Sequence, residues 1–256
     1  MSTALSVAYS ELTRVLPWSL RALGYAFGTA DRGAHLVATG AALNPAVLDE
    51  VRQAGQRPSH RFRYRKSNRL VTLDAAGISL LETGPVAMDG LAAHVDRSGW
   101  TLCRIAGATE LSLLPAVLVG AMDYDLCSIG VVAGDDTLAW HLAEAGPGGS
   151  LYSGRGRESL AALLGGNREV PELVEGAELT PGSVLLLVGS GTPELRPSDH
   201  AAVRPREKIH AAYGNGIPVS RQTLDSFYAL EVLTWAPTSE RSRAQAGFTV
   251  ASAPGS

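Results

Sequence analysis

The sequence of 256 residues contains few of the side chains that most often form cross-links or bind metals. Its two cysteines, Cys103 and Cys127, each lie within an apolar run, where a thiol usually acts as a small buried hydrophobe. We therefore predict a structural role for both. The six histidines are scattered and none is paired at the spacing of zinc ligands, so the sequence predicts no metal site.

Charge and long apolar runs are also scarce. Charged residues make up 18% of the chain and the net charge is −3, which gives no overall attraction for nucleic acid or an anionic membrane. No stretch reaches the roughly 18 uninterrupted apolar residues of a membrane span. The amino-terminal segment carries Glu11 and lacks the basic lead and apolar run of a secretory signal. These absences predict a cytoplasmic protein that binds neither nucleic acid nor membranes.

Three common catalytic signatures are missing as well. No Gly-x-Gly-x-x-Gly follows a predicted strand, and neither Gly-x-x-x-x-Gly-Lys-Ser/Thr nor Gly-x-Ser-x-Gly occurs. The sequence therefore gives no support for a classical dinucleotide-binding fold, a P-loop or a serine esterase.

The pattern of apolar residues predicts an α/β protein. Helical spacing over 12–23 and 30–43 indicates an amino-terminal helical layer covering about residues 1–55. From there, predicted strands and helices alternate, which favours a largely parallel sheet with right-handed βαβ crossovers. We expect one α/β domain over residues 1–250 and a disordered tail at 251–256. The predicted strands are 69–74, 99–105, 127–132 and 184–189, and the predicted helices are 84–96, 111–122, 135–143 and one that begins at Ser220.

A basic segment is the strongest local charge feature. In a strand, Arg61, Arg63 and Arg65 share one face, where guanidinium groups can converge on a carboxylate or phosphate. They are our candidate residues for binding a small anionic or carboxylated ligand. The alternative is that the positive charge protects an exposed edge strand against pairing with another chain.

Three further residues are candidates for catalysis. Glu110 and Ser112 follow a predicted strand and open a helix, the position at which open α/β sheets bind ligands, and they could act as base and hydrogen-bond donor. The alternative is that Thr109 caps the helix and Glu110 complements its dipole. His35 is placed on the core-facing side of its helix, beside Arg32 and Gly33, and is the third candidate.

Five segments of the central sequence follow one another in a recognisable order: Leu73-Asp-Ala-Ala-Gly77, Gly84-Pro-Val-Ala-Met-Asp-Gly-Leu91, Ser98-Gly-Trp-Thr-Leu102, Ala106-Gly-Ala-Thr-Glu-Leu-Ser112 and Ser128-Ile-Gly-Val-Val132. Together they resemble the type-2 malate/L-lactate dehydrogenase family. That resemblance implies a fold distinct from the Rossmann type, an amino-terminal helical layer, a homodimer, and reduction of 2-oxo acids or cyclic imines with NAD(P) as cofactor. The tail at 236–247 resembles a poorly characterised bacterial family that ends in a similar Pro-x-(Ser/Thr)-Glu-x-Ser-Arg run, and its Arg241 and Arg243 are added to the candidate substrate-binding residues.

The sequence departs from that family at two elements. Where the family has Ser-His-Gly the chain reads Ala38-Thr-Gly-Ala-Ala-Leu43, and where it has Asn-His-Phe-Gly the chain reads Thr109-Glu-Leu-Ser112. Both family histidines that handle the proton are thus missing. Two hypotheses follow: an enzyme acting on a small carboxylated metabolite, either a nicotinamide-dependent reductase or a non-redox descendant, or a catalytically degenerate binding or accessory subunit.

Overall fold

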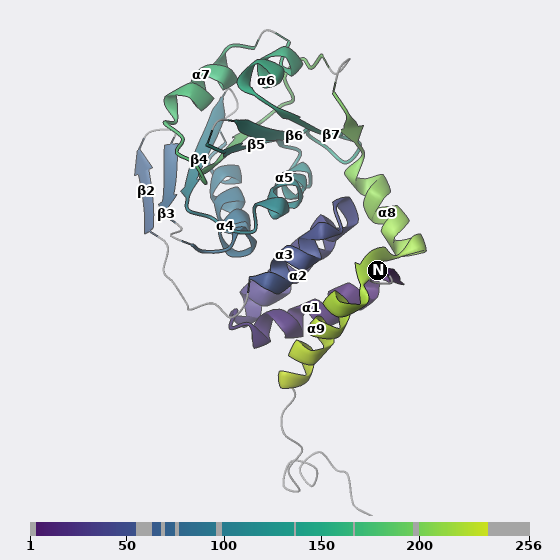
Figure 1. The fold of residues 1–256 in the computed structure, drawn as a ribbon. Coiled ribbons are helices and arrows are strands. Elements are labelled where there is room, and N and C mark those ends of the chain that lie inside the picture. Colours follow the sequence, from purple (N-terminus) through teal and green to yellow (C-terminus); the bar gives the residue numbers. More distant parts are fainter. Residues whose placement is uncertain are drawn as a thin grey trace, which may run out of the picture.

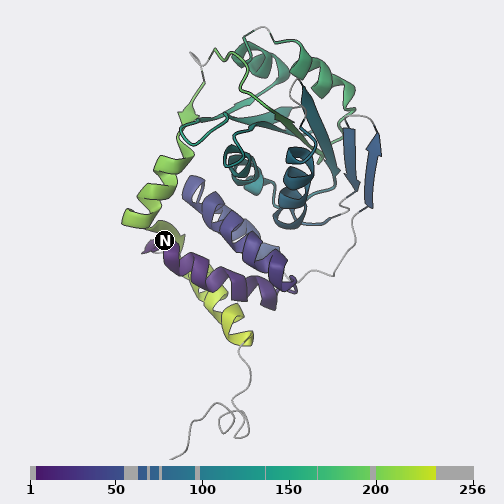
Figure 2. The same cartoon turned by 180° about the vertical axis from the view of Figure 1, so that it is seen from behind.

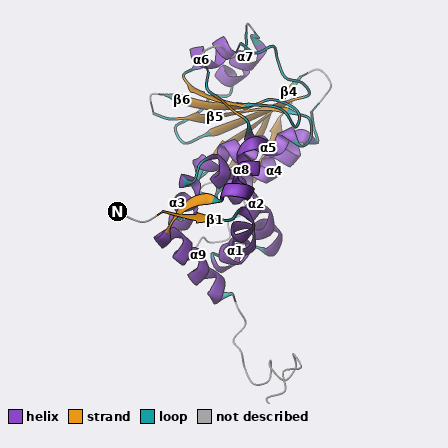
Figure 3. Ribbon diagram, turned by 90° about the vertical axis from the view of Figure 1, so that its right-hand side faces the viewer, coloured by secondary structure: helices purple, strands orange, loops and turns teal. Residues whose placement is uncertain are grey.

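The computed structural model describes residues 4–54, 63–67, 70–74, 77–95, 99–135, 137–165, 167–196 and 200–234. These residues form an eight-stranded sheet, with two short helices on one face and several layers of helices below the other (Figures 1 and 3). A separate two-stranded ribbon lies among the lower helices. The α/β class and the amino-terminal helical layer that the sequence predicts are therefore confirmed.

The large sheet has the strand order β2-β3-β4-β8-β5-β6-β7-β9. Of the described strands in it, one neighbouring pair, β3 and β4, is parallel, and the others are antiparallel. The strands are β2 (Arg63–Ser67), β3 (Leu70–Asp74), β4 (Trp100–Ala106), β5 (Cys127–Ala133), β6 (Leu138–Ala143), β7 (Leu151–Arg155), β8 (Val184–Gly189) and β9 (Ala202–Val203).

The prediction of a largely parallel sheet is wrong, because a strand from much later in the chain enters the middle of the sheet. Strands β3, β4 and β5 do run in one direction, joined by helical crossovers, but β8 inserts between β4 and β5 and runs antiparallel to both. The predicted helix over 135–143 is also wrong. Leu138, Trp140 and Leu142 alternate with less buried neighbours and form β6, which pairs with β5 as a hairpin.

Two helices pack directly against each face of the large sheet. Helices α4 (Leu80–Ala92) and α5 (Leu114–Met122) lie below it, with the short helix η1 (Leu111–Leu113) leading into α5, and α6 (Arg157–Leu163) and α7 (Glu169–Gly176) lie above. Helix α4 begins earlier than predicted, because the Ser79 hydroxyl accepts a hydrogen bond from the Leu81 N–H and caps it.

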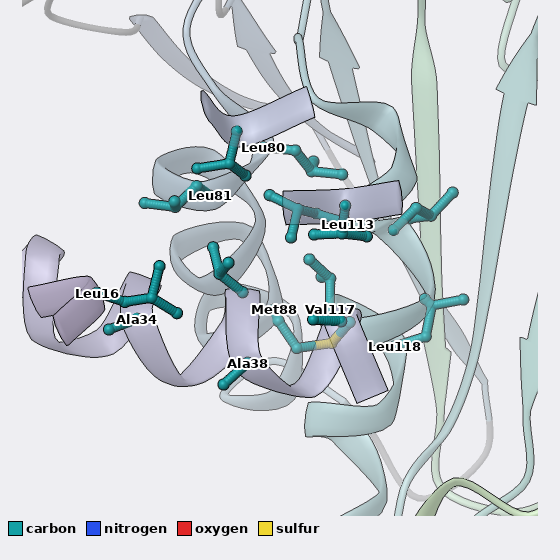
Figure 4. Packing of buried hydrophobic residues seen from close by; sticks show 14 of the residues in the cluster. Leu16, Ala34, Ala38, Leu80, Leu81, Met88, Leu113, Val117 and Leu118 are labelled. Carbon is teal, nitrogen blue, oxygen red and sulfur yellow. The ribbon is translucent and has the colours of Figure 1, made fainter. Parts of the chain in front are cut away.

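The next helices, on the side of α4 and α5 that faces away from the sheet, are α1 (Tyr9–Ala22), α2 (Phe27–Leu43) and α3 (Ala46–Gln53). Helix α2 buries mainly small residues, which bring its axis close to α4: a Cβ at Gly33 would lie 2.4 Å from Leu81 Cδ2. Met88 of α4 and Val117 of α5 lie next to each other in this packing, with Ala38 of α2 close by (Figure 4).

The carboxy-terminal elements return to the amino-terminal ones. Helix α8 (Pro205–Asn215) runs from the edge of the sheet to the ribbon formed by β1 (Ala4–Val7) and β10 (Ile217–Ser220), and α9 (Arg221–Leu233) lies along α1 (Figure 2). The Ser220 side chain accepts a hydrogen bond from the Thr223 N–H, which confirms the predicted cap of α9.

Both cysteines are buried, as predicted. Cys103 on β4 and Cys127 on β5 are free thiols, and burial raises the pKa of each to about 12, so neither is a reactive thiolate near neutral pH. Among the described residues no helix is long and apolar enough to cross a membrane. The predicted tail at 251–256 lies outside the described residues.

Candidate functional site

An open cavity of about 610 Å³ lies between α2, α4, α5 and α8. This volume is within the range of roughly 300–1,000 Å³ typical of small-molecule sites. Its lining combines an apolar floor with charged and aromatic side chains at the rim. The polar and aromatic lining residues are Arg32, His35, Thr39, Asp89, Asp123, Tyr124, Arg206, His210 and Tyr213.

Two helices provide most of the polar side chains, and they do so with the same spacing. Helix α2 contributes Arg32, His35, Leu36 and Thr39, and helix α8 contributes Arg206, Ile209, His210 and Tyr213. Positions i, i+3, i+4 and i+7 share one face of a helix. Each helix therefore turns one such face towards the cavity, with an arginine at its start.

Each of these arginines is held by one carboxylate from a neighbouring element. The Arg32 Nη2 donates to Asp89 Oδ1 of α4 at 2.6 Å, and the Arg206 Nη2 donates to Asp123 Oδ1, just after α5, at 2.8 Å. The hydrogen bond from Arg32 to Asp89 raises the pKa of the arginine further. The four side chains are 44% to 70% exposed, so these ion pairs add little to stability. A guanidinium has several N–H donors, so each arginine can also bind a ligand carboxylate.

Aromatic residues complete the rim. The rings of Tyr124 and Tyr213 are 57% and 61% exposed, although each belongs to a residue type that favours contact with apolar groups. The Tyr213 ring lies 4.5 Å from that of Tyr9, measured between ring centroids, and the Tyr9 hydroxyl shares a 3.4 Å hydrogen bond with Thr39. Tyr213 and Thr39 are thus fixed through one residue of α1, which ties opposite sides of the cavity together.

The structure places His35 at this cavity, but not as predicted. Its side chain is exposed instead of facing the core, because Ala34 and Val37 take the buried positions on that turn of α2. His210 of α8 lines the same cavity. Imidazole rings are common general acids and bases, so the two histidines can take part in acid–base chemistry on a ligand held there.

The turn that carries Glu110 and Ser112 is separate from the cavity, with Glu110 buried and Ser112 partly buried. Glu110 is 6% exposed, has the left-handed backbone conformation (φ 51°), and its Oε2 accepts a 2.8 Å hydrogen bond from the Thr109 hydroxyl. The Ser112 hydroxyl donates to the carboxylate of Glu50 on α3. Neither residue lines the cavity described above, so the structure does not bring these two candidates together with His35.

The basic strand lies at another edge of the molecule. Arg63 and Arg65 are exposed on β2, the outermost strand of the sheet beside β3, and neither lines the cavity. This placement agrees with the edge-protection alternative. Arg61, Arg241 and Arg243 lie outside the described residues, so the predicted anion site stays a prediction.

Sequence reasoning missed most of the cavity, including the whole of α8. Pro205 at the start of this helix and Glu207 in its first turn are helix-start signals that could have found it. The polar stripe on α2 could have been recognised from its spacing alone. No spacing rule, however, indicates that α8 packs beside α2, because they are more than 160 positions apart in the chain.

In the described part of the chain, no group of three or more histidine, cysteine, aspartate or glutamate residues could hold a metal ion. The carboxylates at the cavity are instead occupied by arginines.

Comparison with known proteins shows the fold. No model of a known protein family matches the sequence, and no curated protein matches it significantly. Similar solved structures include a dehydrogenase from Sinorhizobium meliloti (TM-score 0.62, 14% identity, 90% of this chain and 100% of that chain). Also similar is a malate dehydrogenase from Entamoeba histolytica, with a TM-score of 0.61, 10% identity, and coverage of 92% of this chain and 100% of that chain. A third is a sulfolactate dehydrogenase from Methanocaldococcus jannaschii, with a TM-score of 0.62, 10% identity, and coverage of 88% of this chain and 96% of that chain. The chain therefore has the malate/lactate dehydrogenase-like fold, as the sequence resemblance implies.

Proposed function

We propose that this protein is an enzyme that binds a small carboxylated metabolite in the cavity between α2, α4, α5 and α8 and moves a proton on it. The observation that carries the proposal is the shared cavity face of α2 and α8, which presents Arg32 and Arg206 with His35 and His210. The guanidinium groups bind the carboxylate, and one imidazole acts as the general base. The names of the structural neighbours, malate and sulfolactate dehydrogenase, are those of enzymes acting on such acids and support this kind of substrate.

The proposal gives the nicotinamide cofactor implied by the sequence resemblance no place in this cavity. Sites of roughly 300–1,000 Å³ enclose one drug-sized ligand, and the cavity of about 610 Å³ lies in the middle of that range. A dinucleotide next to a second ligand needs a longer site. We therefore assign no hydride transfer to these residues.

Proton exchange on a 2-oxo acid tests the proposal without a cofactor. Pyruvate in deuterated buffer exchanges the protons next to its carbonyl through an enolate, and nuclear magnetic resonance follows the exchange. The protein should accelerate this exchange, and His35→Gln or His210→Gln should reduce the acceleration by about 10²-fold or more if that histidine is the base. Loss of absorbance from a reduced nicotinamide, measured in parallel, tests for reductase activity.

A binding or accessory protein is the second candidate function. It is favoured by the buried turn at Thr109–Ser112, whose polar groups are bonded to the protein itself at the position where the resembled family carries a catalytic histidine. In that case pyruvate or a related acid should raise the melting temperature by mass action, with no proton exchange and no oxidation of the nicotinamide. If no 2-oxo acid changes the melting temperature or exchanges protons, both functions are wrong.

A further inference from the structure

We infer that the preferred ligand of the cavity carries a bulky apolar or aromatic body on its carboxylate, and that a short acid such as pyruvate or a dicarboxylate such as oxaloacetate binds there more weakly. This inference rests on the proposed function and names the substrate class for the same cavity. It follows from the apolar residues that line the floor of the cavity, which differ from the charged residues at its rim.

The floor is apolar and is formed by residues of four helices. Half of the lining residues have apolar side chains or none, and they come mostly from α4 and α5: Leu36, Pro85, Met88, Ala116, Val117, Val119, Gly120, Met122 and Ile209. A three-carbon acid bound to either arginine would leave most of this surface in contact with water. A larger apolar body would remove it from water, and that is the main favourable contribution to binding an apolar group.

The charges at the rim disfavour a polar body. Arg32 and Arg206 are each paired with an aspartate, so the two ion pairs together add no net charge. A second carboxylate on the ligand would have to be desolvated beside an arginine whose charge is already balanced by Asp89 or Asp123. An apolar body over the floor has no such desolvation cost.

Gly120 offers a place where side-chain volume can be added at the cavity. This residue of α5 is exposed and lines the cavity, and a Cβ added to it would have no atom within 4 Å. Tyr124 and Tyr213 stand at the rim with more than half of their surface exposed, and aromatic rings in that position pack well against an apolar or aromatic ligand.

The test compares probe acids that differ in the body alone. Calorimetric titration should show that phenylpyruvate binds about ten- to a hundredfold more tightly than pyruvate, the gain expected from burying a benzyl group. Oxaloacetate should bind no more tightly than pyruvate, and 2-phenylethanol, which has the ring without the carboxylate, should bind more weakly than phenylpyruvate. Equal affinity for phenylpyruvate and pyruvate, or tightest binding of oxaloacetate, overturns the inference and leaves the proposed function standing.

A cavity-filling variant tests the position of the body. Gly120→Leu replaces a helical glycine by a better helix former, so the variant should fold, and its side chain should take up part of the space along the α5 wall of the cavity. The preference for phenylpyruvate over pyruvate should then fall to about one. The matched control is Gly176→Leu on α7, across the sheet, where an added Cβ also has no atom within 4 Å. An unchanged preference in Gly120→Leu overturns the inference, whereas failure of every acid to bind the wild-type protein overturns the proposed function with it.

Discussion

The polar residues of the turn at Thr109–Ser112 differ from those of the cavity between α2, α4, α5 and α8 in their burial and in their hydrogen bonding. At the turn, Glu110 is buried and Thr109 and Ser112 are partly buried, and hydrogen bonds join Thr109 to Glu110 and Ser112 to Glu50. At the cavity, the charged groups are half exposed, and each arginine has one carboxylate partner among the described residues. A buried polar group that is fully bonded stabilises the fold, and an exposed one that keeps spare donors can bind a ligand. The difference separates residues that build this protein from those that can act on a ligand.

Substituting Glu110 should have the largest effect of the changes considered, and it should be on stability. A β-branched residue is disfavoured in the left-handed conformation that Glu110 adopts, and Glu110→Val also removes the acceptor of the Thr109 hydroxyl. We expect the free energy of unfolding in urea to fall by about 1–3 kcal/mol. Glu110→Gln, which keeps the size and an acceptor, is the control. If the Gln variant folds normally and loses proton exchange, the turn is catalytic and the contrast between the two regions fails.

Substituting an arginine of the cavity should instead lower ligand affinity and leave stability almost unchanged. Arg206→Gln removes a charge-assisted hydrogen bond to the ligand, so affinity should fall by about tenfold or more. The free energy of unfolding should change by less than about 1 kcal/mol, because an exposed ion pair contributes little. Arg204→Gln is the matched control, since Arg204 is equally exposed, has a 3.7 Å contact with Glu207, and does not line the cavity. Equal loss of affinity in both variants would argue for a general effect of surface charge.

A third cluster, between α1 and α9, provides an acid-sensitive reference away from both regions. Hydrogen bonds from Arg14 and Tyr228 lower the pKa of the Glu11 carboxyl to about 2 from its ordinary value of 4.5. Its contribution to stability is therefore fully present above about pH 4.5 and is lost as the pH falls towards 2. In urea denaturation at a series of pH values, Glu11→Gln should be less stable than the wild type above pH 4.5 and approach it near pH 2. A constant difference would mean that the ionised carboxylate does not matter.

Arg63 should show the smallest effect. Because Arg63 is exposed on an edge strand, Arg63→Gln should change the free energy of unfolding by less than about 0.5 kcal/mol and leave the affinity for phenylpyruvate unchanged. A tenfold loss of affinity in this variant would place the anion site on β2 and not at the cavity.

The sequence predicted local elements well because their signals are local. Helices α1 and α2, strands β3, β4, β5 and β8, and the cap at Ser220 all follow from apolar spacing or from one capping side chain. The relative direction of the strands in the sheet could not be predicted this way, because it depends on β8 pairing with strands more than 50 positions away.

The candidate site was harder to predict than the fold. His35 was identified from residue type, but its orientation depends on which face of α2 packs against the rest of the protein. Its partners Arg206 and His210 lie on a helix that the sequence analysis did not predict. The homodimer and the cytoplasmic location stay predictions, which sedimentation and fractionation of cells can check.

The pairing of β1 with β10 has a consequence for synthesis on the ribosome. Ala4 pairs with Ser220, and Arg14 donates to Glu231, 217 positions later. At the usual elongation rate of about 5–20 residues per second, the first helix leaves the ribosome on the order of ten seconds or more before its partner exists. During that interval the apolar face of α1, including Leu12, Leu16 and Leu20, cannot complete its native packing. Nascent chains of this protein should therefore depend on chaperones until the last helix emerges.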